Sequence, residues 1–177
     1  MKDESLCLHA GYTPENAGPR VMPIVQSTTF RYDTTKDIAD LFDLKTANYF
    51  YTRLGNPTCG HVEEKIAALE GGVGAMLTSS GQAATLTSVL TIAKAGDRIL
   101  CSASVYGGTF NLMAVTFKRM GIEVDFFEQS ESDEEIAKRI YPNTKAIFGE
   151  TIANPALTVF DISRFAALAH KHEIPLI

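Results

Sequence analysis

The chain has 177 residues, enough for one domain with a short extension. Apolar residues make up 45% of it and charged residues 21%, close to average globular usage, which excludes a largely disordered chain. The formal net charge of −5, without any basic run, gives no electrostatic basis for binding nucleic acid.

Residues 1–57 are predicted to be mostly irregular, because glycine and proline recur along them. One short helix is predicted within residues 34–47, where Ile38, Leu41 and Phe42 fall at helical spacing. Apolar islands such as PIVQSTTF lie among polar residues. They indicate an N-terminal arm that packs on another surface.

From Thr58 onward, residues 58–177, predicted strands alternate with predicted helices. A first helix ends at Gly71-Gly72, and Ser132 and Glu135 have the spacing of a capping box. The predicted strands are 74–78, 98–101, 122–127, 145–149 and a start at 173–177; the other predicted helices are 81–94, 109–120, 132–140 and 161–172. This alternation indicates right-handed crossovers and a mostly parallel sheet, so the predicted fold class is α/β.

The last residues and the cysteines give two expectations, one about the length of the polypeptide and one about its cellular compartment. Residues 174–177 are typical of a buried strand that stops after a few residues, so we expect the first part of a longer polypeptide; a natural chain can also end on a strand. The sequence has no apolar run of about 18 residues and no secretion signal. Three separate cysteines without CxxC favour reduced thiols. We expect a cytoplasmic protein without a membrane partner or a metal site.

The junction Ser79-Ser80-Gly81-Gln82 joins a predicted strand to a predicted helix. Free backbone N–H groups at a helix N-terminus, together with the helix dipole, favour an anion such as phosphate. Glycine allows the anion to come close to the backbone. The alternative is ordinary N-capping by Ser80.

Tyr51 and Arg53 form a second candidate site. In an extended segment residues two apart point the same way, and arginine offers two parallel donors to a phosphate. The alternative is a surface pair beside a turn at Gly55-Asn56-Pro57, and the pattern does not decide between the two.

Two further candidates follow predicted strands. Tyr106, before Gly107-Gly108, could lie flat over an aromatic ligand because the glycines leave room; the alternative is a half-buried tyrosine in a turn. Glu150 and Asn154 follow the strand 145–149 and are expected near the same carboxyl edge of the sheet. Asn-Pro is also a common turn.

In this order the motifs LHAG, PIVQSTTF, YTRLGNPT, ALEGG, SSGQAA, AGDRIL, YGGT, ETIANP and IPLI resemble the pyridoxal-phosphate-dependent enzymes of cysteine and methionine metabolism, of fold type I. The resemblance runs along nearly the whole chain. It implies the first part of a three-layer large domain, with pyridoxal 5′-phosphate as cofactor.

The resemblance also implies roles for particular residues. Ser80, Gly81 and Gln82 would hold the cofactor phosphate, and Asn154 would bind its 3′-oxygen. Tyr106 would stack on the pyridine ring, and Tyr51 and Arg53 would reach the phosphate in a neighbouring subunit. Tyr106 and Tyr51 are the expected catalytic residues. Shared sites imply a homodimer, usually paired into a homotetramer.

Within the family, EGGVGAMLTSSGQAAT and ETIANP are most similar to the O-acetylhomoserine sulfhydrylase branch. That branch replaces acetate at Cγ of a small amino acid by sulfide or a thiol, giving homocysteine in methionine biosynthesis. Cystathionine γ-synthase, cystathionine γ-lyase and methionine γ-lyase remain alternatives.

The family's Schiff-base lysine and the aspartate that faces the pyridine nitrogen would both follow Ile177. We therefore expect the 177-residue chain alone to be inactive. A truncated, non-catalytic product is the alternative from another functional class.

Overall fold

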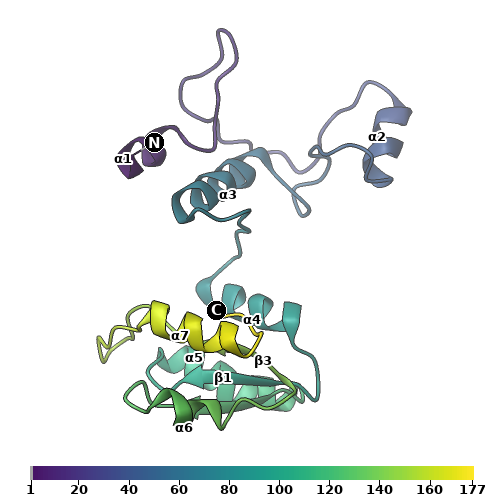
Figure 1. Cartoon of the computed structure of the whole chain (residues 1–177). Coiled ribbons are helices and arrows are strands. Elements are labelled where there is room, and N and C mark those ends of the chain that lie inside the picture. Colours follow the sequence, from purple (N-terminus) through teal and green to yellow (C-terminus); the bar gives the residue numbers. More distant parts are fainter. Residues whose placement is uncertain (1) are drawn as a thin grey trace. The chain divides into compact units, whose positions relative to one another are not determined.

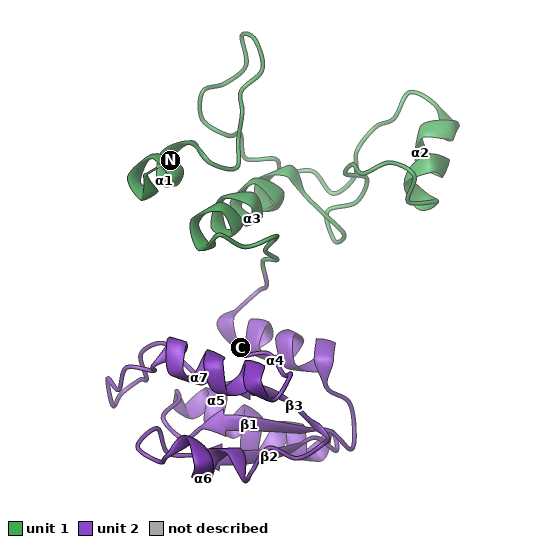
Figure 2. Cartoon of the chain, viewed as in Figure 1, with its two compact units in different colours: residues 1–77 green, residues 78–177 purple. Residues whose placement is uncertain are grey.

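The computed structural model of the protein describes residues 2–177 (Figure 1). The chain divides into two compact units, residues 1–77 and residues 78–177 (Figure 2). The first unit contains the predicted arm together with the helix that follows it. The predicted domain division at residue 57 stays a prediction.

The first unit contains three helices, α1 (Asp3–His9), α2 (Thr35–Phe42) and α3 (Pro57–Glu70). Helix α2 lies where one short helix was predicted, whereas α1 was not predicted. The N-cap of α3 is Asn56, whose side chain accepts a hydrogen bond from the Thr58 N–H at 2.9 Å. Helix α3 ends, as predicted, at Gly71, which adopts a left-handed conformation with φ of 63°.

The first unit has almost no core of its own. Among its described residues, Leu41 is the single buried apolar side chain. Large apolar side chains are instead open to solvent, including Leu8, Val21, Ile24, Leu44 and Leu54. This exposure is what an arm that packs on another surface would show.

The second unit is built on a parallel sheet of β1 (Arg98–Ser102), β2 (Glu123–Phe127) and β3 (Thr144–Phe148), in the order β2-β1-β3. An isolated parallel bridge between Ile147 and Leu176 places the last residues of the chain beside β3. All three strands, and the start of a fourth, lie where the sequence predicted them.

Helices cover both faces of this sheet (Figure 1). On one face, Ile99 and Cys101 of β1 share a buried cluster with α4 (Gly81–Ile92) and with the π-helical segment η1 (Leu112–Phe117), which continues α5 (Gly107–Asn111). On the other face, Leu100 of β1 shares a cluster with α6 (Asp133–Ala137) and α7 (Ile162–Lys171). The second unit is therefore a three-layer α/β structure with a parallel sheet, and the predicted fold class is confirmed.

The predicted strand at residues 74–78 is wrong. A strand needs a neighbouring strand to accept and donate its backbone hydrogen bonds, and none pairs with these residues in the part of the chain that the structure describes. The Leu77 N–H is bonded instead to the Glu63 carboxylate at 2.8 Å. Val73 and Met76 are exposed, so this apolar segment is left uncovered.

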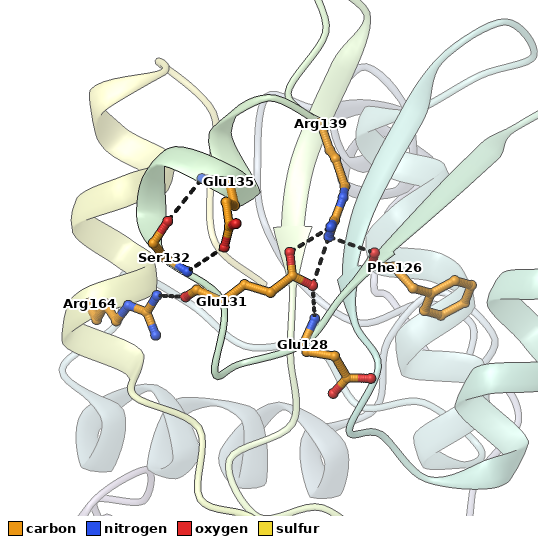
Figure 3. A network of polar contacts seen from close by, with 7 residues as sticks. All are labelled: Phe126, Glu128, Glu131, Ser132, Glu135, Arg139 and Arg164. Carbon is orange, nitrogen blue, oxygen red and sulfur yellow. Dashed lines mark hydrogen bonds and ion pairs between the residues drawn. The ribbon is translucent and has the colours of Figure 1, made fainter.

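The segment between β2 and α6 is tied to its surroundings by two arginines (Figure 3). Arg139 donates to the Glu131 carboxylate at 2.5 Å and to the Phe126 carbonyl at 3.0 Å. Arg164 of α7 donates to the carbonyls of Gln129 and Glu131. The predicted capping box of Ser132 and Glu135 forms here as well.

The contacts of Glu131 predict a pH-dependent loss of stability. Its hydrogen bond with Arg139, followed by that from the Glu128 N–H, lowers the pKa of Glu131 from its ordinary value. A carboxyl whose pKa is lower in the folded state stabilises the fold above its unfolded pKa of about 4.3, and this contribution is lost as the pH falls through the folded value. Glu131→Gln should therefore lower the free energy of unfolding at about pH 7, and the difference from wild type should be smaller at about pH 3, because the contribution is lost as the carboxyl is protonated.

Urea unfolding at both pH values measures this difference. Glu134→Gln is the matched control, because Glu134 is an exposed residue of α6 to which no described residue donates a side-chain hydrogen bond. A difference that persists unchanged at low pH would contradict the assigned role of the carboxylate.

Candidate functional site

The N-terminus of α4 leaves two backbone donors unused. Ser80 caps the helix: its hydroxyl accepts from the Ala83 N–H at 3.1 Å, and its carbonyl accepts from the Ala84 N–H at 3.0 Å. Among residues 2–177, no group accepts a hydrogen bond from the N–H of Gly81 or Gln82. Capping by Ser80 and a free pair of donors therefore occur together at this junction.

The surroundings of Gly81 are open. A Cβ built on Gly81 would meet nothing within 4 Å. Because the two N–H groups also lie at the positive end of a helix of 12 residues, the arrangement fits a phosphate group and its negative charge.

Tyr106 lies immediately before α5, and its ring packs closely over Gly108. A Cβ on Gly108 would come within 2.5 Å of the tyrosine ring, so a larger residue there would displace the ring. Tyr106 is half exposed, so part of it can be reached by a ligand. This agrees with the idea that the glycines make room for an exposed aromatic surface.

A chain of hydrogen bonds connects the start of α4 with the start of α5. The Gln82 side-chain amide donates to the Thr109 hydroxyl at 3.2 Å, and this hydroxyl donates to the Glu150 carboxylate at 2.6 Å. The same carboxylate accepts from the Tyr106 N–H at 2.8 Å. The structure thus brings Gln82, Tyr106 and Glu150 together, as their predicted position at one edge of the sheet required.

Thr109 was missed by the sequence analysis. It is a buried polar residue in the first turn of a helix, and its hydroxyl joins residues far apart in the chain. No motif of the sequence marks it, because a threonine inside YGGTFNL is indistinguishable from an ordinary helical residue.

Asn154 is exposed in the loop that follows β3. The loop is closed by an antiparallel bridge between Ile152 and Val159 and by a hydrogen bond from the Ala153 N–H to the Thr158 carbonyl at 3.0 Å. None of the described residues forms a hydrogen bond with the Asn154 side chain. Its amide is therefore available, but the structure gives it no contact with Tyr106 or Gln82.

Tyr51 and Arg53 belong to the first unit and lie on one side of it. The Arg53 guanidinium is stacked 5.0 Å from the centre of the Tyr51 ring. The backbone there is a turn, with the N–H groups of Leu54 and Gly55 bonded to the Tyr51 carbonyl, so the expected extended segment is wrong. A cation–π contact across this turn brings the two side chains together.

Cys101 lies close to this site without taking part in it. Burial, and secondly the Glu150 carboxylate, raise the pKa of the Cys101 thiol far above its ordinary value. A thiol that stays protonated is a poor nucleophile. Chemistry at this edge of the sheet therefore does not come from Cys101.

Two kinds of feature are absent from the residues that the structure describes. Between residues 2 and 177 there is no helix of the length and apolar character that a membrane crossing needs. The same residues contain no group of three or more His, Cys, Asp or Glu side chains placed to hold a metal ion.

Comparison with known proteins gives consistent matches along the whole chain. The family model described as Cys/Met metabolism PLP-dependent enzyme matches residues 4–177. The O-acetyl-L-homoserine sulfhydrylase of Corynebacterium glutamicum is 44% identical over 175 residues, 98% of this chain and 40% of that protein. The homocysteine/cysteine synthase of Saccharomyces cerevisiae is 41% identical over 179 residues, with 98% and 40% coverage.

Solved structures match equally well. A Campylobacter jejuni structure described as an O-acetylhomoserine (thiol)-lyase, with a pyridoxyl-lysine phosphate at position 205, has a TM-score of 0.94 and 33% identity over 99% of this chain and 42% of that one. Cystathionine γ-lyase from Lactobacillus plantarum has a TM-score of 0.86 and 34% identity, with 99% and 44% coverage. The chain thus spans about 40% of the length of the curated relatives it matches.

Gly81 allows ligand binding to be tested separately from folding. Gly81→Ala should not lower the unfolding midpoint, because the new methyl group has free space and alanine favours a helix over glycine by up to about 1 kcal/mol. The methyl group would add bulk beside the two donors, so affinity for pyridoxal 5′-phosphate should fall about tenfold, as for one charge-assisted hydrogen bond.

Equilibrium dialysis and thermal unfolding give the two values. Gly74→Ala makes the same change at another glycine with open surroundings and should alter neither value much. Undiminished affinity in Gly81→Ala would argue against a phosphate at this helix end.

Proposed function

Because the chain belongs to the Cys/Met-metabolism PLP-dependent enzymes, we propose that it is the phosphate-binding part of a cytoplasmic O-acetylhomoserine sulfhydrylase. The family and its cofactor, pyridoxal 5′-phosphate, are those that the sequence motifs predicted. The observation that carries the proposal is the pair of N–H groups of Gly81 and Gln82, which have no acceptor among the described residues and lie at the N-terminus of α4, where Gly81 has open surroundings.

The donor set of the second unit suits this cofactor. The Gly81 and Gln82 N–H groups would hold the phosphate, and the exposed side of the Tyr106 ring would lie against the pyridine. The free Asn154 amide would bind the 3′-oxygen. Bound pyridoxal phosphate supplies the electron sink for loss of a proton from the substrate, and the protein supplies orientation and electrostatics.

The proposed overall reaction exchanges two groups at Cγ of the substrate. The bond to the acetyl oxygen breaks and acetate leaves, while a bond to sulfide or a thiol forms, giving homocysteine or an analogue. The names of the more similar relatives favour this reaction: O-acetyl-L-homoserine sulfhydrylases from three organisms are 40–44% identical to this chain. Small-molecule substrates and a place in methionine biosynthesis are proposed on the same ground.

The lysine that carries the cofactor is proposed to lie outside these 177 residues. In the Campylobacter jejuni relative the cofactor is attached to a lysine at position 205, a higher number than any in this chain. The 177-residue chain alone is accordingly proposed to be inactive, and turnover would belong to the native-length protein.

A second copy of the protein is the proposed partner of the first unit. Its described residues bury a single apolar side chain and expose many, so this unit gains most of its stability from contact with another surface. In a homodimer, or a homotetramer of two dimers, the stacked Tyr51 and Arg53 would reach the phosphate of the neighbouring subunit.

The reaction is tested by direct assay. The native-length protein, supplied with pyridoxal 5′-phosphate, should form homocysteine from O-acetylhomoserine and sulfide, and the 177-residue chain should not. Cleavage of cystathionine or methionine without use of O-acetylhomoserine would favour a lyase of the same family. Turnover by the 177-residue chain would contradict the proposed division of the site.

Arg53→Ala should weaken cofactor retention in the native-length protein by roughly 1–3 kcal/mol, as expected for loss of a hydrogen bond to a charged group. Arg31→Ala is the control, because Arg31 is also an exposed arginine of the same unit and is paired only with Asp33 among the described residues. Dialysis against cofactor-free buffer, followed by absorbance, measures retention. Equal cofactor retention in both variants would contradict the proposed contact of Arg53 with the cofactor phosphate.

A further inference from the structure

The Glu150 side chain, just after β3, accepts two hydrogen bonds from the start of α5. One carboxylate oxygen accepts the Tyr106 N–H at 2.8 Å, and the other accepts the Thr109 hydroxyl at 2.6 Å. Glu150 follows the end of β3 by two residues, and its partners lie 44 and 41 residues earlier in the chain. The contact therefore exists only when β1 and β3 are paired in the sheet.

The direction of each hydrogen bond in this chain is fixed by chemistry. Thr109 has one hydroxyl hydrogen, which it donates to Glu150, so its oxygen is the acceptor for the Gln82 amide at 3.2 Å. Thr109 is 2% exposed, so water does not compete for these bonds. Gln82 and Tyr106 are thereby both held, directly or through Thr109, by one carboxylate.

We infer that Glu150 is a positioning residue that fixes the Tyr106 ring and the Gln82 end of α4 as one unit. The inference rests on the proposed function, in which the N–H of Gln82 holds the cofactor phosphate and Tyr106 lies against its ring. A ligand that contacts both α4 and α5 then meets a Gln82 N–H and a Tyr106 ring that are already held at a fixed distance from each other. Fewer side chains and backbone groups have to be ordered on binding, which favours affinity.

An ionised carboxylate is the group this position needs. It accepts two hydrogen bonds without donating any, whereas a glutamine of the same shape presents an oxygen on one side and an NH₂ group on the other. With the oxygen toward the Tyr106 N–H, that NH₂ group would face the Thr109 hydroxyl, whose hydrogen would lose its acceptor. Glu150→Gln thus keeps the volume and breaks the chain of bonds.

The first experiment compares Glu150→Gln with Glu128→Gln in the native-length protein. Glu128 follows β2, is exposed, and its side chain has no hydrogen-bond donor among the described residues. We expect about tenfold faster hydrogen exchange at the Tyr106 amide, and about tenfold weaker binding of pyridoxal 5′-phosphate, in Glu150→Gln alone. The circular dichroism induced in the bound cofactor should also change, because it reports the orientation of the ring beside Tyr106.

A second pair of variants separates the hydroxyl of Thr109 from its volume. Thr109→Ser keeps the hydroxyl and should retain the wild-type dichroism, whereas Thr109→Val keeps the shape, loses the hydroxyl and should alter the dichroism as Glu150→Gln does. If Glu150→Gln does not fold, the dichroism of these two Thr109 variants tests the inference in its place. Similar dichroism in the serine and valine variants overturns the inference, as does Tyr106 exchange or cofactor affinity in Glu150→Gln equal to that of the control.

Failure of the proposed function would look different. If the wild-type protein does not bind pyridoxal 5′-phosphate, the proposed function is overturned. The hydrogen-exchange rate of the Tyr106 amide then tests separately whether Glu150 holds the Tyr106 backbone in place. Faster exchange in Glu150→Gln supports this role, and an unchanged rate overturns it.

Discussion

The candidate site depends on the burial of strand β1 on both of its faces. Ile99 and Cys101 pack under α4 and η1, and Leu100 packs under α6 and α7. Because β1 and β3 run parallel, their carboxyl ends meet at one edge of the sheet. The residues after β1 and the residues after β3, which include Tyr106 and Glu150, are thus brought within hydrogen-bonding distance by packing that involves neither of them.

The two units differ in how their stability arises. The second unit has two buried clusters, one on each face of the sheet, and is a folded three-layer structure in itself. The first unit satisfies its backbone locally, through helices, turns and caps, yet buries almost no apolar surface among its described residues. Helices without a buried face are marginally stable in water. On this ground the first unit is proposed to depend on contacts outside itself, and the same exposure is the physical basis for proposing a shared active site.

Local signals in the sequence were accurate where they described single elements. Three strands, the capping box at Ser132 and the stop at Gly71 follow from side-chain pattern and backbone chemistry that operate within a few residues. The same reasoning failed at residues 74–78, where an apolar run predicts a strand. A strand forms only with a partner, and no local pattern reports whether a partner is present.

The sequence by itself determined the α/β class and the helix N-terminus at Ser80-Gly81-Gln82, because each rests on residue types at short, fixed spacing. The family and its cofactor followed from the resemblance of its ordered motifs to those of known enzymes. Tertiary structure alone decided that Glu150 bonds Tyr106 and Thr109, and that Thr109 bonds Gln82. These residues are separated by 27 to 44 positions. A hydrogen bond between them requires an approach within about 3 Å, and only the packed sheet sets that separation.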